Sequence, residues 1–165
     1  MYSKLNFLLI ACMTLLGLSC DPCQNTTCQN DGTCIDGDCE CLPGFEGSQC
    51  EIWTSSKISG NLVITSDCNG GTAESNEWSI GNSATAPNEV LINSFHYLAK
   101  SVIATITDPN TIEIESQTID SPTGDLVTVQ GSGIIISDGQ LMVDYMLWGV
   151  DNPDTIRCTV NAVRQ

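Results

Sequence analysis

The sequence predicts a mostly β protein, in which a small disulfide-rich module precedes an eight-stranded antiparallel meander that closes into a barrel or a flattened sandwich. Six cysteines fall within the 28 residues 23–50, too short a segment to build its own apolar core. From residue 52 onward, short runs rich in Val, Ile and Thr alternate with Gly, Asn, Asp and Pro, which is typical of antiparallel strands and turns. No convincing amphipathic helix interrupts them.

The charge balance excludes one class of partner. The 165 residues include 20 acidic and 5 basic side chains, for a net charge of −15. Such a surface repels nucleic acid and anionic lipid headgroups, so we expect no nucleic-acid partner. It suits a soluble body or one that attracts cations.

Residues 1–19 are predicted to be a signal peptide. Lys4 precedes an apolar run over 5–18, shorter than the roughly 20 residues that span a bilayer. The run ends at Ser19-Cys20, which resembles the cleavage box of bacterial lipoproteins and implies acylation of Cys20. The box before Cys12 is an alternative, and so is an ordinary secretory signal that leaves Cys20 as a free thiol. We expect Sec-type export and a lipid-anchored position at the outer membrane or cell surface.

The ten cysteines all receive a role in this scheme. Cys12 lies in the signal peptide, Cys20 is the lipid site, six lie within 23–50, and Cys68 and Cys158 remain. Six cysteines allow 15 pairings, which spacing cannot separate. There are no paired CxxC knuckles for zinc, and the single histidine is far away in sequence, so we expect no metal.

The cysteine spacing of residues 20–51 resembles an EGF-like module. The resemblance rests on the segment 28–34, on the single residue between Cys39 and Cys41, and on the Gly-Phe-Glu-Gly pattern of 44–50. Asp36 and Asp38 fit a solvated turn better than a calcium site. The resemblance implies the disulfides Cys23–Cys34, Cys28–Cys39 and Cys41–Cys50.

Residues 52–165 are predicted to form the all-β domain. The two remaining cysteines, Cys68 and Cys158, fall in its first and last strands. They become neighbours only if the sheet curls round on itself, so a disulfide between them indicates closure. An eight-stranded barrel either fills with side chains or holds one small ligand. We expect strands near 57–67, 75–80, 89–95, 101–107, 111–118, 126–136, 140–148 and 155–162.

The whole layout resembles surface lipoproteins of the Bacteroidota, whose β domain is described as lipocalin-like. This resemblance implies an architecture and a location but no activity. It rests on segments 60–68, 89–95, 112–119, 130–134, 141–145 and 154–158.

No group of residues in the sequence has the pattern of a catalytic site. His96 has no neighbouring acid in sequence and is interpreted as a loop or packing residue. Glu113 and Glu115 share one strand face, but the alternation with isoleucines turns both toward solvent. The segment 131–133 is too short for a phosphate loop and fits a strand bulge.

The expected function is therefore non-enzymatic, without a cofactor. The EGF-like module would be a spacer and the β domain an interaction module for an unknown surface protein, glycan or small apolar ligand, with the membrane contacted only through the lipid. A lipocalin-like carrier is the alternative, and a carbohydrate-active enzyme is the third. Trp148 and Tyr97 would stack on a ligand if they share one barrel mouth. The segment 151–154 is interpreted as a plain turn in preference to a cation-binding loop. The sequence alone identifies no ligand-binding residues.

Overall fold

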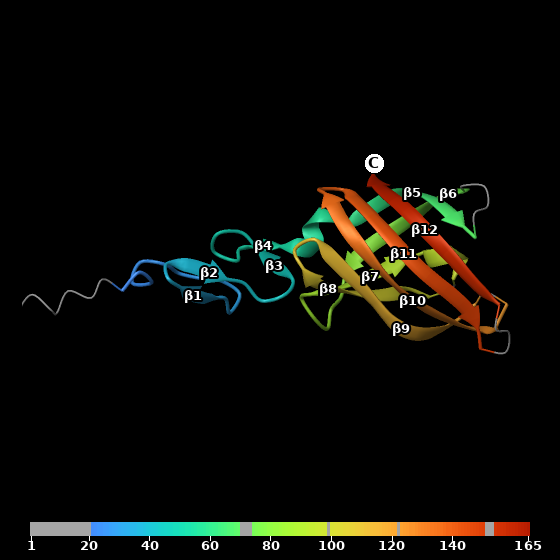
Figure 1. The fold of residues 1–165 in the computed structure, drawn as a ribbon, viewed down its shortest axis with the longest axis horizontal. Coiled ribbons are helices and arrows are strands. Elements are labelled where there is room, and N and C mark those ends of the chain that lie inside the picture. Colours follow the sequence, from blue (N-terminus) through green and yellow to red (C-terminus); the bar gives the residue numbers. More distant parts are fainter. Residues whose placement is uncertain (1–20, 70–73, 99, 122, 151–153) are drawn as a thin grey trace, which may run out of the picture.

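The computed structural model describes residues 21–69, 74–98, 100–121, 123–150 and 154–165. The cysteine-rich module projects from one end of a β-barrel, as Figure 1 shows. Cys12 and Cys20 lie outside the described residues. Within the described ranges, no helix is long and apolar enough to cross a membrane.

Two short hairpins precede the barrel, and the second extends two residues past the predicted module boundary at residue 51. β1 (Thr33–Ile35) pairs with β2 (Asp38–Glu40), and β3 (Phe45–Glu46) pairs with β4 (Ile52–Trp53). Asp36, in the turn between β1 and β2, has a φ of 53°, followed by a glycine at 98°. Positive φ at both positions is what a tight type I′ hairpin turn requires. The disulfides are Cys23–Cys34, Cys28–Cys39 and Cys41–Cys50, the same pairs that the EGF-like resemblance implies.

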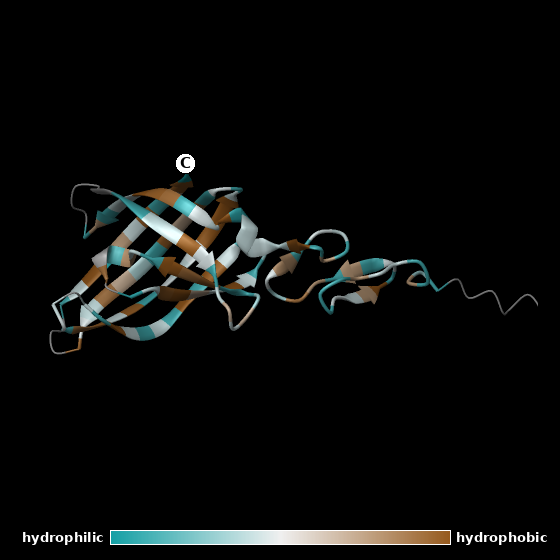
Figure 2. Cartoon of the chain, turned by 180° about the vertical axis from the view of Figure 1, so that it is seen from behind, coloured by the Kyte–Doolittle hydropathy of each residue, from teal (hydrophilic) through white to brown (hydrophobic). Residues whose placement is uncertain are grey.

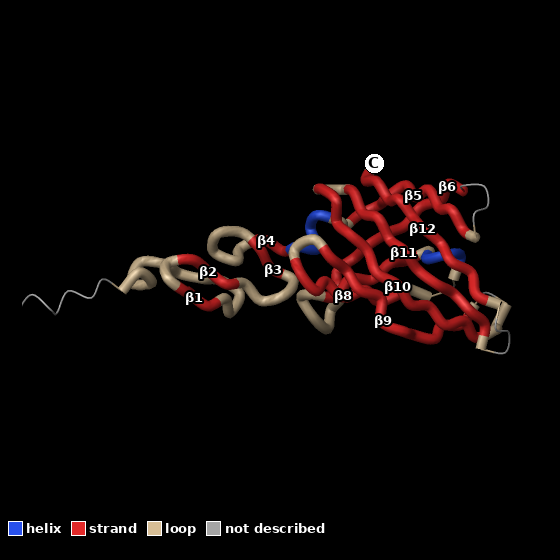
Figure 3. Tube along the Cα trace, in the orientation of Figure 1, coloured by secondary structure: helices blue, strands red, loops and turns tan. Residues whose placement is uncertain are grey.

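Eight antiparallel strands form the barrel, each paired with the next along the chain. The last strand pairs with the first, which closes the sheet, and Figure 3 shows the strands around the barrel. The predicted fold class is therefore confirmed, and closure selects the barrel over the flattened sandwich. The strands are β5 (Gly60–Cys68), β6 (Glu74–Asn82), β7 (Glu89–Asn93), β8 (Val102–Asp108), β9 (Thr111–Asp120), β10 (Leu126–Ser137), β11 (Gln140–Gly149) and β12 (Thr155–Arg164).

Side chains from every strand occupy the barrel interior. Apolar and polar residues alternate along the strands, visible as brown and teal bands in Figure 2, so each strand turns one face inward. The inward residues form one continuous core. Its largest fully buried members are Trp78, Phe95, Ile58, Leu62, Ile92, Ile106, Ile112, Ile114 and Leu141.

The predicted glycine bulge is present in β10. The register between β10 and β9 shifts between Val129 and Gly131. Gly131 lies opposite Tyr145 on β11, and a Cβ at Gly131 would come within 2.7 Å of the Tyr145 Cβ. The absence of a side chain therefore lets β10 and β11 pack tightly where the sheet bends.

Two strands have boundaries that differ from the sequence prediction, one at its start and one at its end. The first predicted strand begins at 57, but η2 (Thr54–Lys57) is a 3₁₀ turn and β5 starts only at Gly60. The third predicted strand continues to 95, whereas β7 ends at Asn93 and η3 (Phe95–Tyr97) follows. Ser94 has a φ of 60°, and this left-handed backbone breaks the ladder. The hydrophobic pattern of the sequence indicates neither the 3₁₀ turn at η2 nor the left-handed backbone at Ser94.

Candidate functional site

The two ends of the barrel have different neighbours. The module end carries η2 and the turns at 83–88, 109–110 and 138–139. The opposite end, here called the distal mouth, carries η3 and the described residues 123–125 before β10. In Figure 1 the module and the distal mouth lie at opposite ends of the molecule. The distal mouth is therefore the part of the barrel farthest from the module.

A pocket of about 530 Å³ opens at the distal mouth. Its apolar side chains come from β10, β11, β12 and the loop after η3, which are far apart in sequence. Leu126 and Ile156 remain 47% and 37% exposed, so the pocket presents apolar surface to solvent. We call it the distal pocket; its lining is His96, Leu98, Ser121, Thr123, Asp125, Leu126, Val127, Leu147, Trp148, Gly149, Val150, Asp154 and Ile156.

An aromatic layer closes the barrel near this pocket. The Phe95 ring stacks on Trp78 with centroids 5.0 Å apart and packs against Tyr145 at 4.5 Å. All three side chains are buried. The distal pocket therefore lies at the mouth of a barrel whose interior is already packed with side chains.

His96 contacts both the aromatic layer and the barrel seam, which is the junction of β5 and β12 that the Cys68–Cys158 disulfide joins. Its backbone is left-handed, with a φ of 43°, and its Nδ1 lies 2.9 Å from the Tyr145 hydroxyl. The Cys158 sulfur lies 4.0 Å from the same nitrogen. His96 thus packs at the mouth, as the sequence suggests, and also lines the distal pocket, which the sequence does not indicate.

The cluster of Cys68, Cys158 and His96 has the residue types of a metal site. Their potential ligand atoms lie within 4.8 Å of one another. The two sulfurs are bonded to each other, however, and metals bind cysteine as the thiolate. In the disulfide form this cluster therefore closes the barrel and does not offer thiolate ligands.

Two carboxylates lie at the rim of the distal pocket, Asp125 and Asp154. The turn after β9 holds Asp125 through side-chain contacts. Its Oδ2 accepts a hydrogen bond from the Thr123 hydroxyl at 2.7 Å, and its N–H donates to Ser121 Oγ at 3.2 Å. Asp154 belongs to the segment interpreted as a turn, of which 151–153 lies outside the described residues.

A second hollow, the outer groove, lies on the outside of the barrel and has a volume of about 660 Å³. Exposed side chains line it, among them Asp67, Glu113 and Asp144. Asp144 accepts a hydrogen bond from Thr159 at 2.6 Å. Glu113 and Glu115 both lie on the solvent side of β9, because Ile112 and Ile114 are fully buried.

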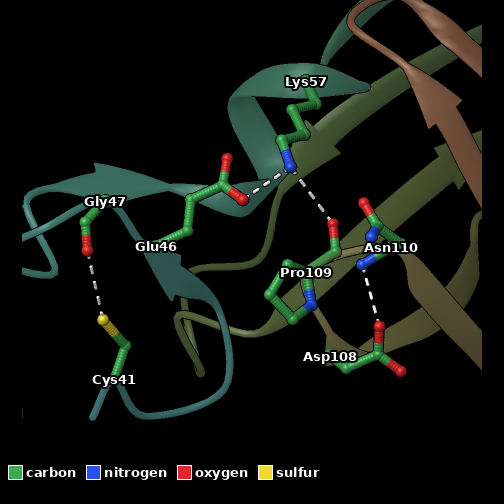
Figure 4. Close-up of polar contacts among 7 residues, drawn as sticks. All are labelled: Cys41, Glu46, Gly47, Lys57, Asp108, Pro109 and Asn110. Carbon is green, nitrogen blue, oxygen red and sulfur yellow. Dashed lines mark hydrogen bonds and ion pairs between the residues drawn. The ribbon is translucent and has the colours of Figure 1, made fainter. Parts of the chain in front are cut away.

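The module is seated on the barrel through a polar joint, shown in Figure 4. Lys57 of η2 lies 2.5 Å from a Glu46 carboxylate oxygen and donates a hydrogen bond to the Pro109 carbonyl at 3.3 Å. Gly44 packs so close to the turn before β7 that a Cβ there would lie 2.8 Å from the Pro87 carbonyl oxygen. The joint therefore links the module to two separate barrel turns.

One residue that the sequence predicts at a barrel mouth lines the distal pocket. Trp148 lies in the lining, as considered for a ligand-stacking residue, while the Tyr97 side chain lies outside what the structure describes. The sequence pattern gives no indication that the apolar residues Leu126, Val150 and Ile156 line a pocket. They fall on three different segments, so only the strand order brings them together.

A family model described as EGF-like domain matches residues 12–50, which identifies the N-terminal module as EGF-like. The match begins at Cys12, within the predicted signal peptide. Among solved structures, a redesigned β-barrel is 18% identical, covering 68% of this chain and 95% of its own, with a TM-score of 0.47. A redesigned β-barrel bound to the small molecule DFHBI is 16% identical, covering 67% and 98%, with a TM-score of 0.48. A protein from Bacteroides fragilis, provisionally described as an outer membrane protein, is 16% identical, covering 67% and 52%, with a TM-score of 0.42.

Proposed function

We propose that this chain is an exported, lipid-anchored surface protein that binds a small apolar ligand at the distal pocket. In this proposal 1–19 is the signal peptide, 20–51 is the EGF-like spacer carrying the lipid on Cys20, and 52–165 is the binding domain. Its type is that of the Bacteroidota surface lipoproteins that the sequence resembles. The barrel acts by binding and not by catalysis.

The observation that carries the proposal is the position of the distal pocket at the end of the barrel opposite the module. An anchor at Cys20 would hold the module nearest the membrane. The joint through Lys57, Glu46 and Pro109 restrains the barrel against the module. The pocket would then face away from the membrane, toward diffusing ligands.

The packed interior favours binding at the mouth over binding inside the barrel. Core residues such as Leu141 and Val143 on β11 are fully buried, and an internal ligand would have to displace them. Leu126, Val150 and Ile156 lie in the pocket with 47%, 55% and 37% of their surface exposed. Covering this surface with an apolar ligand would be favourable at roughly 25 cal/mol per Å².

Ligand binding is tested with N-phenyl-1-naphthylamine, a neutral apolar dye whose fluorescence rises in apolar surroundings. We expect saturable binding that falls about tenfold in the double variant Leu126→Ser/Ile156→Ser. The matched control is Ile103→Ser/Ile134→Ser, because these side chains are also 45% and 52% exposed but lie outside the distal pocket. Equal loss in both variants, or no saturable binding at all, would refute the proposal.

The anchor is tested by the intact mass of protein extracted from membranes. A chain that starts at Cys20 and carries acyl groups should gain eight hydrogens on reduction, two for each of the four disulfides. Cys20→Ser should release the protein from membranes, whereas Cys12→Ser should not. An unacylated native mass would refute the lipid anchor. Ligand binding at the distal pocket would still be tested by the dye experiment.

A further inference from the structure

Backbone hydrogen bonds hold the barrel seam together on both sides of its disulfide. Cys68 and Cys158 lie directly opposite each other, and the β5–β12 ladder continues from them for six further residue pairs. Just beyond the two cysteines, the Asn69 N–H donates to the Arg157 carbonyl at 2.8 Å, and the Arg157 N–H donates to Asn69 Oδ1 at 2.9 Å. We therefore expect the folded barrel to keep the two cysteines opposite each other when their bond is opened.

The turn at η3 brings His96 to the same seam. Phe95 is fully buried and stacks on Trp78 with ring centroids 5.0 Å apart, which fixes the turn against the core. His96 follows with a left-handed backbone, and its Nδ1 lies 4.0 Å from the Cys158 sulfur. The potential ligand atoms of Cys68, Cys158 and His96 all lie within 4.8 Å of one another. Only the closed barrel brings these three residues together, so the sequence spacing gives no sign of the cluster.

Reduction of the disulfide would turn this cluster into a set of metal ligands. A dithiol reductant transfers two electrons and two protons to the Cys68–Cys158 bond, leaves two thiols and becomes a disulfide itself. Zinc binds cysteine as the thiolate, so both thiol protons are released when the ion binds. Two thiolates and one neutral imidazole are typical zinc ligands, and they leave the fourth tetrahedral position to water.

The distances suit a zinc ion after a small adjustment. Bonds of about 2.3 Å to sulfur and about 2.0 Å to nitrogen place tetrahedral ligand atoms about 3.5–3.8 Å apart. The Cys158 sulfur and His96 Nδ1 therefore need to approach by only about 0.5 Å from their present 4.0 Å. Once their bond is open, the two sulfurs separate by rotation about the Cα–Cβ bonds of the cysteines.

The imidazole of His96 has to exchange one contact to bind the ion. Its Nδ1 now lies 2.9 Å from the Tyr145 hydroxyl, and the ion would take the place of this hydroxyl. Metal-bound histidines keep a hydrogen bond at their second ring nitrogen, so further contacts of the imidazole are compatible with this role.

We propose that Cys68, Cys158 and His96 bind a zinc ion at the distal end of the barrel when a dithiol has reduced the disulfide. The seam is then joined by the disulfide in the oxidised protein and by the ion in the reduced protein. The proposal does not depend on ligand binding at the distal pocket.

The test uses cobalt(II), which substitutes for zinc and absorbs visible light when thiolates bind it in a tetrahedral site. The full protein is reduced with dithiothreitol, separated from the reductant without oxygen, and titrated with cobalt. The six reduced cysteines of the module also bind metal, so the reference is Cys68→Ser/Cys158→Ser, which retains all six. We expect the native sequence to bind about one more equivalent of tetrahedral cobalt than this reference, and zinc to displace it. The oxidised protein should show none of this absorption.

His96→Ala should weaken the additional site at least about tenfold, because it removes one of the three ligands. The matched control is Tyr145→Phe, which removes the hydroxyl beside His96 and leaves all three ligands in place, so the additional equivalent should remain. Circular dichroism of each reduced protein reports whether the barrel stays folded.

Equal cobalt binding by the native sequence and the double serine variant would overturn the proposal, whether the barrel stays folded on reduction or opens. Undiminished binding in His96→Ala would also overturn it, because the histidine would then not be a ligand. Equal losses in His96→Ala and Tyr145→Phe would assign the effect to general disturbance of the barrel mouth, with the same consequence.

Discussion

Cys158 on the last barrel strand lies directly opposite Cys68 on the first, and their disulfide bonds the two strands that close the barrel. Their separation of 90 residues makes this the longest loop that the four described disulfides close. Because loop-closure entropy grows with loop length, this disulfide should restrain the unfolded chain more than each of the other three does.

Replacing both of these cysteines with serine should destabilise the barrel by up to about 4 kcal/mol, because the chain-entropy effect of a loop near 90 residues is lost. Guanidinium denaturation followed by tryptophan fluorescence measures the change. The matched control, Cys41→Ser/Cys50→Ser, should perturb the module and leave the barrel transition in place. A loss below about 1 kcal/mol would mean that the β5–β12 ladder keeps the seam closed without the bond.

Gly131→Ala should destabilise the barrel by about 1–3 kcal/mol through overpacking. The new Cβ would clash with the Asp144 carbonyl oxygen and would lie 2.7 Å from the Tyr145 Cβ, so β10 and β11 would have to separate. Gly81→Ala on β6 is the control, since nothing lies within 4 Å of its Cβ position. Thermal unfolding of both variants compares them directly, and equal melting temperatures would contradict the tight approach at Gly131.

Lys57→Met should loosen the module from the barrel. The ion pair with Glu46 is partly shielded, with side chains 25% and 18% exposed, and we expect it to contribute about 1 kcal/mol. Small-angle X-ray scattering should then show a broader distribution of module positions. Lys100→Met removes the same charge from an exposed pair with Asp120 and should leave the scattering unchanged. An unaltered profile for Lys57→Met would indicate that Gly44 packing alone holds the joint.

Asp108 should make barrel stability depend on acid pH. The Asn110 N–H donates to its carboxylate at 2.9 Å and, with the Thr111 hydroxyl, lowers the pKa of Asp108 below its usual value. A carboxylate whose pKa is lower in the folded state contributes stability that is complete above the unfolded pKa of about 3.9. That stability is lost as pH falls through the folded pKa.

Asp108→Asn therefore should be less stable than the native protein at pH 7, with the difference shrinking below about pH 4. Denaturation midpoints of both proteins between about pH 2.5 and 7 measure this difference. A difference that stays constant across this range would contradict a role for the ionised carboxylate. Because the side chain is fully exposed, we expect a small effect.

The sequence by itself determined the strand pattern and the fold class. Period-2 alternation such as Ile112-Glu113-Ile114 requires one buried and one solvated face, and turn residues such as Asp138-Gly139 mark where each strand ends. Two leftover cysteines at opposite ends of the β domain indicated closure. The EGF-like spacing is local, so it was readable without any knowledge of the tertiary structure.

The tertiary structure decided the candidate site. Asp125, Trp148 and Ile156 come from different strands and turns, and only the order and shear of a closed barrel bring them to one mouth. The same holds for the contact of His96 with Tyr145, which are 49 residues apart. Strand propensity and alternation are local properties, whereas a pocket depends on which distant strands become neighbours, and the side-chain pattern of a single strand carries no record of that.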